Sequence, residues 1–170
     1  LNPINDGSDM KAIYAPWRMT YLKSDKPDGC VFCKDSLRQE DLILLEGKTA
    51  YVMLNLYTYI NGHLMIIPYR HVCKLDDLTP EEKLEMFQLI DISVKSLEDC
   101  MHPEGFNVGI NLGKAAGAGV DDHVHIHVVP RWIGDTNFMT IIGEVRVIPD
   151  DLIKTWERLV PLFRKYYQED

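Results

Sequence analysis

The chain has 170 residues, of which 46% are hydrophobic, so it is long enough and apolar enough to fold around one ordinary core. Its formal net charge is −8, with 18 Lys and Arg against 26 Asp and Glu, which excludes a general basic surface for nucleic acid. No apolar run approaches the roughly 18 residues of a membrane span and no signal peptide is recognisable, so we expect no membrane partner.

The beginning of the chain divides into a polar tail and an aromatic segment. Residues 1–9 are polar and turn-rich, so we expect a disordered or expression-derived tail there and a single domain over residues 10–170. Residues 14–19 are aromatic and basic. In the interpretation that we favour, the Trp17 side chain packs this segment against the core. In the alternative, Trp17 or Arg18 contacts a nucleotide.

Cys30 and Cys33 form a Cys-x-x-Cys pair, a motif shared by redox sites and metal sites. No helix pattern follows the pair directly, which weakens the redox interpretation. A structural zinc needs four ligands, so two others would have to come from elsewhere in the chain. The alternative is a pair of reduced, partly buried thiols. The pair also favours a reducing compartment, and we expect a cytoplasmic protein.

Two segments with strand character meet at a short turn. Residues 41–46 and 49–55 predict a hairpin that turns at residues 46–48. Asn55 ends the second strand, where an Asn is also an ordinary turn residue. Residues 62–68 predict a third, buried strand.

His63 lies near the start of that third strand. The preceding Gly62 permits a close approach of the backbone, which favours a functional His over one that merely caps the strand.

Residues 75–101 predict mostly one helix. Thr79 is the expected N-cap, Pro80 occupies the first position and Glu82 completes a capping box. Apolar residues recur at helical spacing, and we expect their stripe to be buried in the core. These residues are Leu84, Phe87, Ile90, Val94 and Leu97.

Residues 105–113 alternate and lead into a loop of Gly and Ala at residues 114–119. Such a loop exposes backbone N–H groups that can form an anion nest. The spacing of a Walker loop is absent, so the loop by itself is weak evidence for a phosphate site. It gains weight because it leads directly into a cluster of histidines.

His123, His125 and His127 lie two residues apart, and the chain has only six histidines. Because side chains two apart on a strand share one face, residues 122–132 predict a strand with an imidazole ladder on one face. Val124, Ile126 and Val128 would occupy the other face. The non-functional alternative is a solvated strand face that happens to carry His. It is disfavoured because imidazoles rarely cluster this way.

The end of the chain predicts a short strand at residues 140–147 and a second helix at residues 149–167. The apolar residues at helical spacing are Leu152, Trp156, Leu159, Leu162 and Phe163. Strands and helices therefore occur in the order expected for an α+β domain with helices on an antiparallel sheet.

The run His123, His125, His127, Val128 and Val129 resembles the signature of the histidine triad family, His-x-His-x-His followed by two apolar residues. Supporting similarity covers about residues 12–139, most of the chain. Residues 130–139 and 14–19 resemble the diadenosine tetraphosphate phosphorylase branch of that family.

The resemblance implies a sheet of about five strands with two main helices, and a homodimer whose sheets join. It also implies a structural zinc. The ligands in family members that carry the Cys pair correspond to Cys30, Cys33, His71 and His123.

The implied activity is nucleotidyl transfer at the α-phosphate of an adenine dinucleoside polyphosphate. By resemblance, His125 attacks the phosphorus and becomes adenylylated, while His127 and His63 hydrogen-bond the phosphate. The residues expected to hold the nucleotide are Asn55 at the ribose and Asn111, Gly119, Val120 and His127 at the phosphate. In the phosphorylase branch inorganic phosphate is the co-substrate, and Arg131, Arg18 and Lys114 are basic candidates for holding it.

One stretch departs from the family pattern. Many members have Gln or Ser just before the triad, near a phosphate oxygen, whereas this chain has Asp121 and Asp122. Two acids would repel a phosphate if they pointed inward, so we expect them to be exposed. Asp122 could instead orient an imidazole.

Three alternatives remain open from the sequence. The protein could be a family hydrolase of dinucleoside polyphosphates or nucleoside phosphoramidates, with water as acceptor. His123, His125 and His127 could instead bind a catalytic metal directly, as in a metal-dependent hydrolase or oxygenase. The third alternative is a nucleotide-binding interaction protein with little turnover.

Overall fold

A computed structural model describes residues 29–37, 42–56, 58, 60–135 and 151–167. The predicted tail at residues 1–9, the aromatic segment at residues 14–19 and the predicted strand at residues 140–147 lie outside the described residues.

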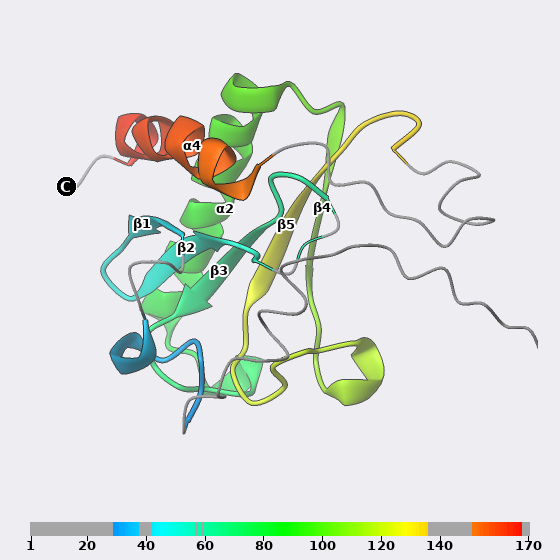
Figure 1. The fold of residues 1–170 in the computed structure, drawn as a ribbon. Helices are drawn as coiled ribbons and strands as arrows, with labels where there is room; N and C mark the ends of the chain where they lie inside the picture. Colours follow the sequence, from blue (N-terminus) through cyan, green and yellow to red (C-terminus); the bar gives the residue numbers. More distant parts are fainter. Residues whose placement is uncertain (1–28, 38–41, 57, 59, 136–150, 168–170) are drawn as a thin grey trace, which may run out of the picture.

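The described strands form one antiparallel sheet of five strands in the order β1-β2-β3-β5-β4 (Figure 1). Their bounds are β1 Ile43–Glu46, β2 Ala50–Leu54, β3 Leu64–Pro68, β4 Gly105–Ile110 and β5 Ile126–Arg131. The predicted hairpin is β1 and β2, and its turn is closed by the Gly47 N–H, which donates to Ala50 O at 2.8 Å. The α+β prediction is confirmed.

Two long helices complete the fold, α2 (Pro80–Met101) and α4 (Leu152–Tyr166). The predicted capping box is present: the Thr79 side chain accepts from the Glu82 N–H, and the Glu82 carboxylate accepts from the Thr79 N–H. Asp151 caps α4 without a capping box: its side chain accepts from the Ile153 and Lys154 N–H groups. α2 crosses one face of the sheet and α4 packs beside it over β1 (Figure 1). None of the described helices is both long and apolar enough to cross a membrane.

The buried face of α2 differs from the predicted stripe. Leu84 and Phe87 are 63% and 68% exposed, and Ile90 and Val94 are only half-buried, while Leu97 is buried as expected. The residues that face the core are Glu82, Met86, Leu89, Ser93, Ser96 and Leu97. The prediction was wrong because this inner face carries the polar residues Glu82, Ser93 and Ser96, of which Glu82 and Ser93 are hydrogen-bonded inside the protein, and apolar periodicity therefore does not mark it.

Side chains bury both faces of the central strands. Val52, Leu54, Leu64 and Ile66 pack beneath the helices in the main core. The other face carries a smaller cluster, formed by Phe32, Tyr51, Met53, Met65 and Ile67. Met65 pairs directly with His127 across β3 and β5, so His127 projects from the face of the sheet that carries this smaller cluster.

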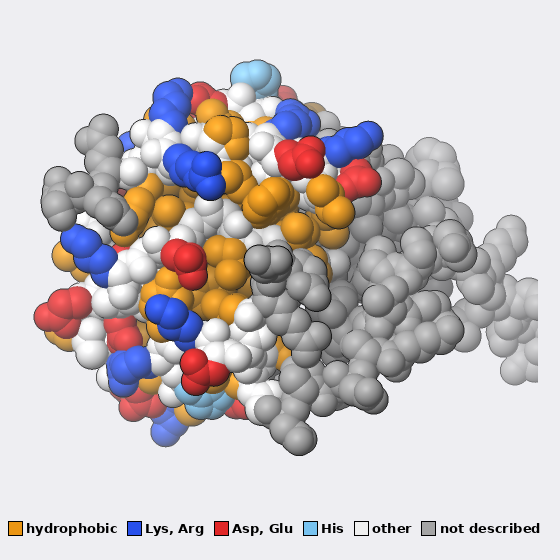
Figure 2. All heavy atoms as spheres, turned by 60° about the vertical axis from the view of Figure 1, so that its left-hand side comes forward, with side chains coloured by type: hydrophobic (Ala, Val, Ile, Leu, Met, Phe, Trp, Pro, Cys, Tyr) orange, Lys and Arg blue, Asp and Glu red, His pale blue; other side chains and the backbone are white. Residues whose placement is uncertain are grey.

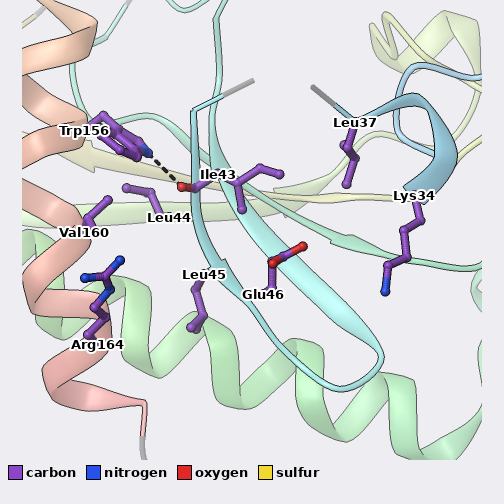
Figure 3. Close-up of a pocket in the computed structure, with 9 residues that line it drawn as sticks. All are labelled: Lys34, Leu37, Ile43, Leu44, Leu45, Glu46, Trp156, Val160 and Arg164. Atoms are coloured by element: carbon purple, nitrogen blue, oxygen red, sulfur yellow. Dashed lines mark hydrogen bonds between the residues drawn. The ribbon is translucent and has the colours of Figure 1, made fainter. Parts of the chain in front are cut away.

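A groove of about 610 Å³ follows the β1 edge of the sheet. It lies between β1, α4 and the short 3₁₀ helix η1 (Lys34–Ser36). The Trp156 Nε1–H donates to Ile43 O at 2.7 Å across its floor (Figure 3). Hydrophobic side chains gather on this side of the molecule between scattered charges (Figure 2). None of the described residues that line the groove is a histidine or a cysteine, so it is not the site predicted from the imidazoles.

Candidate functional site

The histidine ladder forms, but its strand is shorter than predicted. β5 begins only at Ile126, and residues 123–126 are buried without alternation. This stretch is anchored instead by the Val124 N–H, which donates to Val72 O at 2.7 Å. The rings of His125 and His127 still lie side by side, with centroids 4.7 Å apart. Strand periodicity therefore predicted the neighbourhood of the imidazoles but not the conformation that produces it.

His125 is buried, and one hydrogen bond fixes its tautomer. Its Nδ1 lies 2.8 Å from His123 O, and because a carbonyl oxygen only accepts, Nδ1 carries the proton. The other nitrogen, Nε2, therefore keeps a free lone pair. Phe32 packs edge-on against the ring at 5.0 Å between centroids, and burial lowers the pKa of His125. The geometry holds a neutral imidazole with one nucleophilic nitrogen.

His63 joins the ladder from the neighbouring strand. Its Nε2 lies 3.0 Å from His127 Nδ1, as the prediction of a His beside the triad requires. Gly62 adopts a φ of +76°, and a Cβ there would lie 2.7 Å from Met101 Sδ on α2. The glycine is thus required both for the turn and for the close approach that delivers His63 to the ladder.

Two predicted amides flank the His63–His127 pair. Asn55 Nδ2 lies 3.3 Å from His63 Nδ1, and Asn111 Nδ2 lies 3.4 Å from His127 Nε2. The backbone also ties the end of β2 to the start of β3, since the Asn55 N–H donates to His63 O at 2.9 Å. Both amides predicted to hold a nucleotide therefore lie at the imidazoles.

The imidazoles of His63 and His127 resist protonation. Burial, and secondarily the neighbouring His127 and His125, lowers the pKa of His63 to about 4; burial and then His125 lower that of His127 to about 4. Between about pH 4 and the ordinary value of 6.5, the unfolded chain binds protons that the folded chain does not. These two groups therefore contribute stability above pH 6.5 that is lost as the pH falls toward 4.

We expect the His63→Asn variant to lose less stability than the wild type between pH 6.5 and pH 4. One removed imidazole should reduce that loss by about 1–2 kcal/mol, a figure discounted for its partial exposure. Urea unfolding at several pH values measures the free energy of unfolding of both proteins. The predicted metal-binding residues are the same in both, so their contribution to the pH dependence cancels in the comparison. Parallel pH dependences of the two proteins would contradict the depressed pKa.

Four sulfur and nitrogen atoms converge beside the ladder. The ligand atoms of Cys30, Cys33, His71 and His123 all lie within 4.8 Å of one another. Cys30 Sγ is 3.3 Å from His123 Nδ1, and Cys33 Sγ is 3.4 Å from His71 Nδ1. This is the set predicted from the family resemblance, brought together from three separate parts of the chain. Two sulfurs and two nitrogens at this spacing fit one tetrahedral metal ion.

Hydrogen bonds from neighbouring backbone groups favour the protonation states in which His123 and Cys30 can bind a cation. His123 Nε2 lies 2.9 Å from Pro68 O, so Nε2 carries the proton and Nδ1 offers its lone pair toward Cys30. The Phe32 N–H donates to Cys30 Sγ at 3.4 Å, which favours a thiolate. Burial raises the pKa of the Cys30 thiol in opposition, and a bound cation would offset that effect. His125 and His127 belong to no metal-ligand cluster of the described residues, so the alternative of a metal bound by all three triad histidines is not supported.

The loop before the ladder places its acids as predicted. Asp121 and Asp122 are exposed, and Lys114 Nζ lies 3.8 Å from Asp121 Oδ2 on the surface. Gly119 is exposed as well, whereas Val120 packs against the small cluster around Phe32.

Arg131 lies on the same face of β5 as His127 but is engaged in other contacts. Its guanidinium donates twice to the Asp135 carboxylate, at 2.5 and 2.7 Å, and once to Asn107 Oδ1 at 2.7 Å. Lys114 is also paired, and Arg18 lies outside the described residues. An acceptor phosphate that relied on Arg131 would have to compete with this carboxylate.

The sequence did not reveal the role of Phe32. Its ring lies between two members of the ladder, 6.0 Å from His123 and 5.0 Å from His125, and its carbonyl accepts from the Tyr51 hydroxyl at 2.9 Å. The available signal was an aromatic residue inside the Cys-x-x-Cys insert, which alone says nothing of a partner about 90 residues away.

Comparison with known proteins decides the family. The model of the HIT domain matches residues 36–132, more than half of the chain. The chain belongs to the histidine triad family. It is 38% identical over 168 residues to AP-4-A phosphorylase of Mycobacterium tuberculosis, an alignment that covers 92% of this chain and 86% of the relative. This agrees with the predicted branch.

Two further proteins are also similar to this chain. The asymmetrical bis(5'-nucleosyl)-tetraphosphatase of Schizosaccharomyces pombe is 36% identical over 93 residues, covering 55% of this chain and 50% of the relative. The crystal structure of a Zn-bound histidine triad family protein from Mycobacterium smegmatis matches with a TM-score of 0.65 and 28% identity, covering 80% of this chain and 94% of that one.

Proposed function

We propose that this histidine triad protein is a diadenosine tetraphosphate phosphorylase, which transfers an adenylyl group through a covalent histidine intermediate to inorganic phosphate. The observation that carries the proposal is the tautomer of His125, whose Nδ1–H is held by His123 O so that Nε2 is free to attack. The extended similarity to the AP-4-A phosphorylase of M. tuberculosis supports the choice of substrate and acceptor.

The reaction has two balanced steps. The His125 Nε2 lone pair forms a bond to the α-phosphorus, and the bond from that phosphorus to the bridging oxygen breaks, releasing ATP. A phosphate oxygen then attacks the same phosphorus, the P–N bond breaks, and ADP leaves with the imidazole restored. Because the same nitrogen attacks and departs, a neutral buried imidazole suits both steps.

The other side chains of the site hold charge and position. We expect His127 and Asn111, which lie 3.4 Å apart, to contact the phosphate oxygens, Asn55 to contact the ribose, and Gly119 and Val120 to supply backbone donors. Such fixed donors stabilise the charge that develops in the transition state. His63 supports His127 through their 3.0 Å contact.

We further propose that the protein binds one structural zinc through Cys30, Cys33, His71 and His123. A bound zinc would supply a closed four-ligand crosslink, without an open position for substrate. This chain's residues then position the ladder: Pro68 O holds His123, and Val72 O holds the Val124 N–H. A cytoplasmic location, where thiols stay reduced, fits such a site.

We also propose that the protein forms a homodimer. β4 lies at an edge of the sheet, with Val108 47% exposed on it, and Leu84 and Phe87 are exposed on α2. A strand edge and large apolar side chains are surfaces that a second copy would cover. The apolar periodicity of α2 would then mark an interface between subunits in place of the core of one subunit.

The acceptor is tested by the products. With diadenosine tetraphosphate and millimolar phosphate we expect ADP and ATP, whereas hydrolysis gives AMP and ATP. Water is far more concentrated than phosphate, so phosphate prevails only if the site binds and orients it. Chromatography across phosphate concentrations measures the ratio of ADP to AMP. An AMP yield unchanged by phosphate, with no ADP, would identify a hydrolase of the tetraphosphatase or phosphoramidase kind.

A further inference from the structure

Asn107 and Arg131 form a hydrogen-bonded pair on the same face of the sheet as His127. Asn107 lies directly opposite Val129 in the register of β4 and β5. Residues paired in this way share a face, and so do residues two apart along one strand. Arg131 Nη1 donates to Asn107 Oδ1 at 2.7 Å, which joins the two strands on this face. The Asn107 side chain therefore projects from the face that carries the imidazoles.

The contact with Arg131 fixes which way the Asn107 amide points. A guanidinium only donates hydrogen bonds, so the amide atom that faces it is the oxygen. The guanidinium is itself held, because its Nε and Nη2 donate to the Asp135 carboxylate at 2.5 and 2.7 Å. The Asn107 Nδ2–H₂ group therefore faces away from Arg131. Because Asn107 is exposed, this group presents two N–H donors at the face of the sheet.

Between His127 and Asn107, β4 carries no side chain on this face. Gly109 lies opposite His127 and is exposed. A Cβ at Gly109 would meet no atom of the described residues within 4 Å, so crowding does not explain the glycine. A glycine inside a strand weakens it and often marks a place where a ligand approaches the backbone closely. An open path thus leads from His127 over Gly109 to the Asn107 amide, two residues or about 7 Å along β4.

The leaving group of the proposed reaction should follow this path. In transfer at phosphorus the attacking and leaving atoms lie roughly in line, on opposite sides of the phosphorus. With His125 as the nucleophile, the leaving group extends away from His125. His127 is the next member of the ladder, with ring centroids 4.7 Å apart, and β5 continues from it to Arg131. The departing polyphosphate should therefore extend past His127 along this face.

We propose that Asn107 is a specificity-determining residue that donates from its Nδ2–H₂ group to phosphate oxygens of the leaving nucleotide. This inference rests on the proposed function and adds a subsite to it. Phosphate oxygens are charged acceptors, which form the stronger kind of hydrogen bond. Gly109 lets the polyphosphate lie close to β4, and Arg131 keeps the donors of Asn107 turned toward it. Side chains stand roughly perpendicular to a sheet, so a second copy paired along the β4 edge leaves Asn107 accessible.

Two substrates with the same adenylyl group and different leaving groups test the assignment. Diadenosine tetraphosphate releases ATP, whereas adenosine 5'-phosphoramidate releases only ammonia. Asn107→Asp keeps an oxygen for Arg131 but replaces the donor by a negative oxygen. It should lower kcat/KM for the tetraphosphate at least about tenfold and change that for the phosphoramidate less than about twofold. Asn107→Leu, which removes the donor without adding charge, should show the same selectivity with a smaller loss.

A matched control separates the position from the change in charge. Gln88→Glu makes the same amide-to-carboxylate change at an exposed position of α2 and should leave the turnover of both substrates unchanged. Equal losses with the two substrates in both Asn107 variants would mean that Asn107 only supports the fold. Normal turnover of the tetraphosphate in both variants would also overturn the assignment.

Calorimetry distinguishes a failure of this inference from a failure of the proposed function. Asn107→Asp should weaken the binding of a nonhydrolysable dinucleotide at least about tenfold and leave the binding of AMP unchanged. A wild type that binds the dinucleotide without turning it over would refute the proposed function, while this difference in binding would still support Asn107. Equal affinities of the wild type and Asn107→Asp for the dinucleotide would refute the role of Asn107 even where the wild type is a phosphorylase.

Discussion

Replacing His125 by alanine should lower the turnover of diadenosine tetraphosphate by at least about a thousandfold, with little change in nucleotide binding. The side chain supplies the attacking Nε2, whereas the phosphate contacts expected from Asn111 and His127 do not depend on it. Steady-state kinetics give the loss in kcat, and calorimetry with a nonhydrolysable dinucleotide gives the dissociation constant.

A matched control and a trapped intermediate make the result specific. His102→Asn removes another imidazole, at the left-handed end of α2, where an Asn is well tolerated, and should retain full turnover. Mass spectrometry of a quenched wild-type reaction should find the adenylyl adduct on His125. An adduct on His127, or near-normal turnover in His125→Ala, would assign the nucleophile elsewhere.

Local sequence signals predicted most of the fold. The Thr79–Glu82 capping box acts within one helical turn and the β1–β2 hairpin within one short turn, so each can be recognised without the rest of the chain. The face that α2 buries could not be recognised, because it depends on which neighbours satisfy its polar groups. Glu82 is only 4% exposed because Arg70 pairs with it at 2.7 Å, and Ser93 is buried because it donates to Leu89 O.

The identity of the site residues could be predicted, but their tautomers could not. Spacing and family resemblance identified His63, His125 and His127 as neighbours. The protonation of His125 depends on the carbonyl of His123, which accepts from His125 Nδ1 in a stretch that precedes the start of β5 at Ile126. Phe32 likewise acquires its contact with His125 only through folding. Backbone carbonyls and packed rings carry no side-chain signature that a sequence motif records.

Loss of the metal cluster should reduce stability more than any other change in the described part of the chain. Cys30→Ser should lower the zinc content from about one equivalent to near zero, because a closed four-ligand site binds through all of its ligands. Losing a site that joins Cys30 to His71 and His123 should remove several kcal/mol of stability, which is about 10 °C or more in Tm for a domain of this size. Elemental analysis and thermal unfolding measure the two effects.

The control for this change is another cysteine of the same chain. Cys73 is exposed and outside the cluster, so Cys73→Ser should keep both the zinc content and the Tm. Cys30→Ser should retain measurable turnover at low temperature, because His125 still forms its bond to His123 O there. Turnover abolished together with zinc under conditions where the variant remains folded would make the metal part of the chemistry. Wild-type protein from zinc-supplemented medium with less than about a tenth of an equivalent of any transition metal would leave the four residues as reduced thiols and imidazoles held together by folding alone.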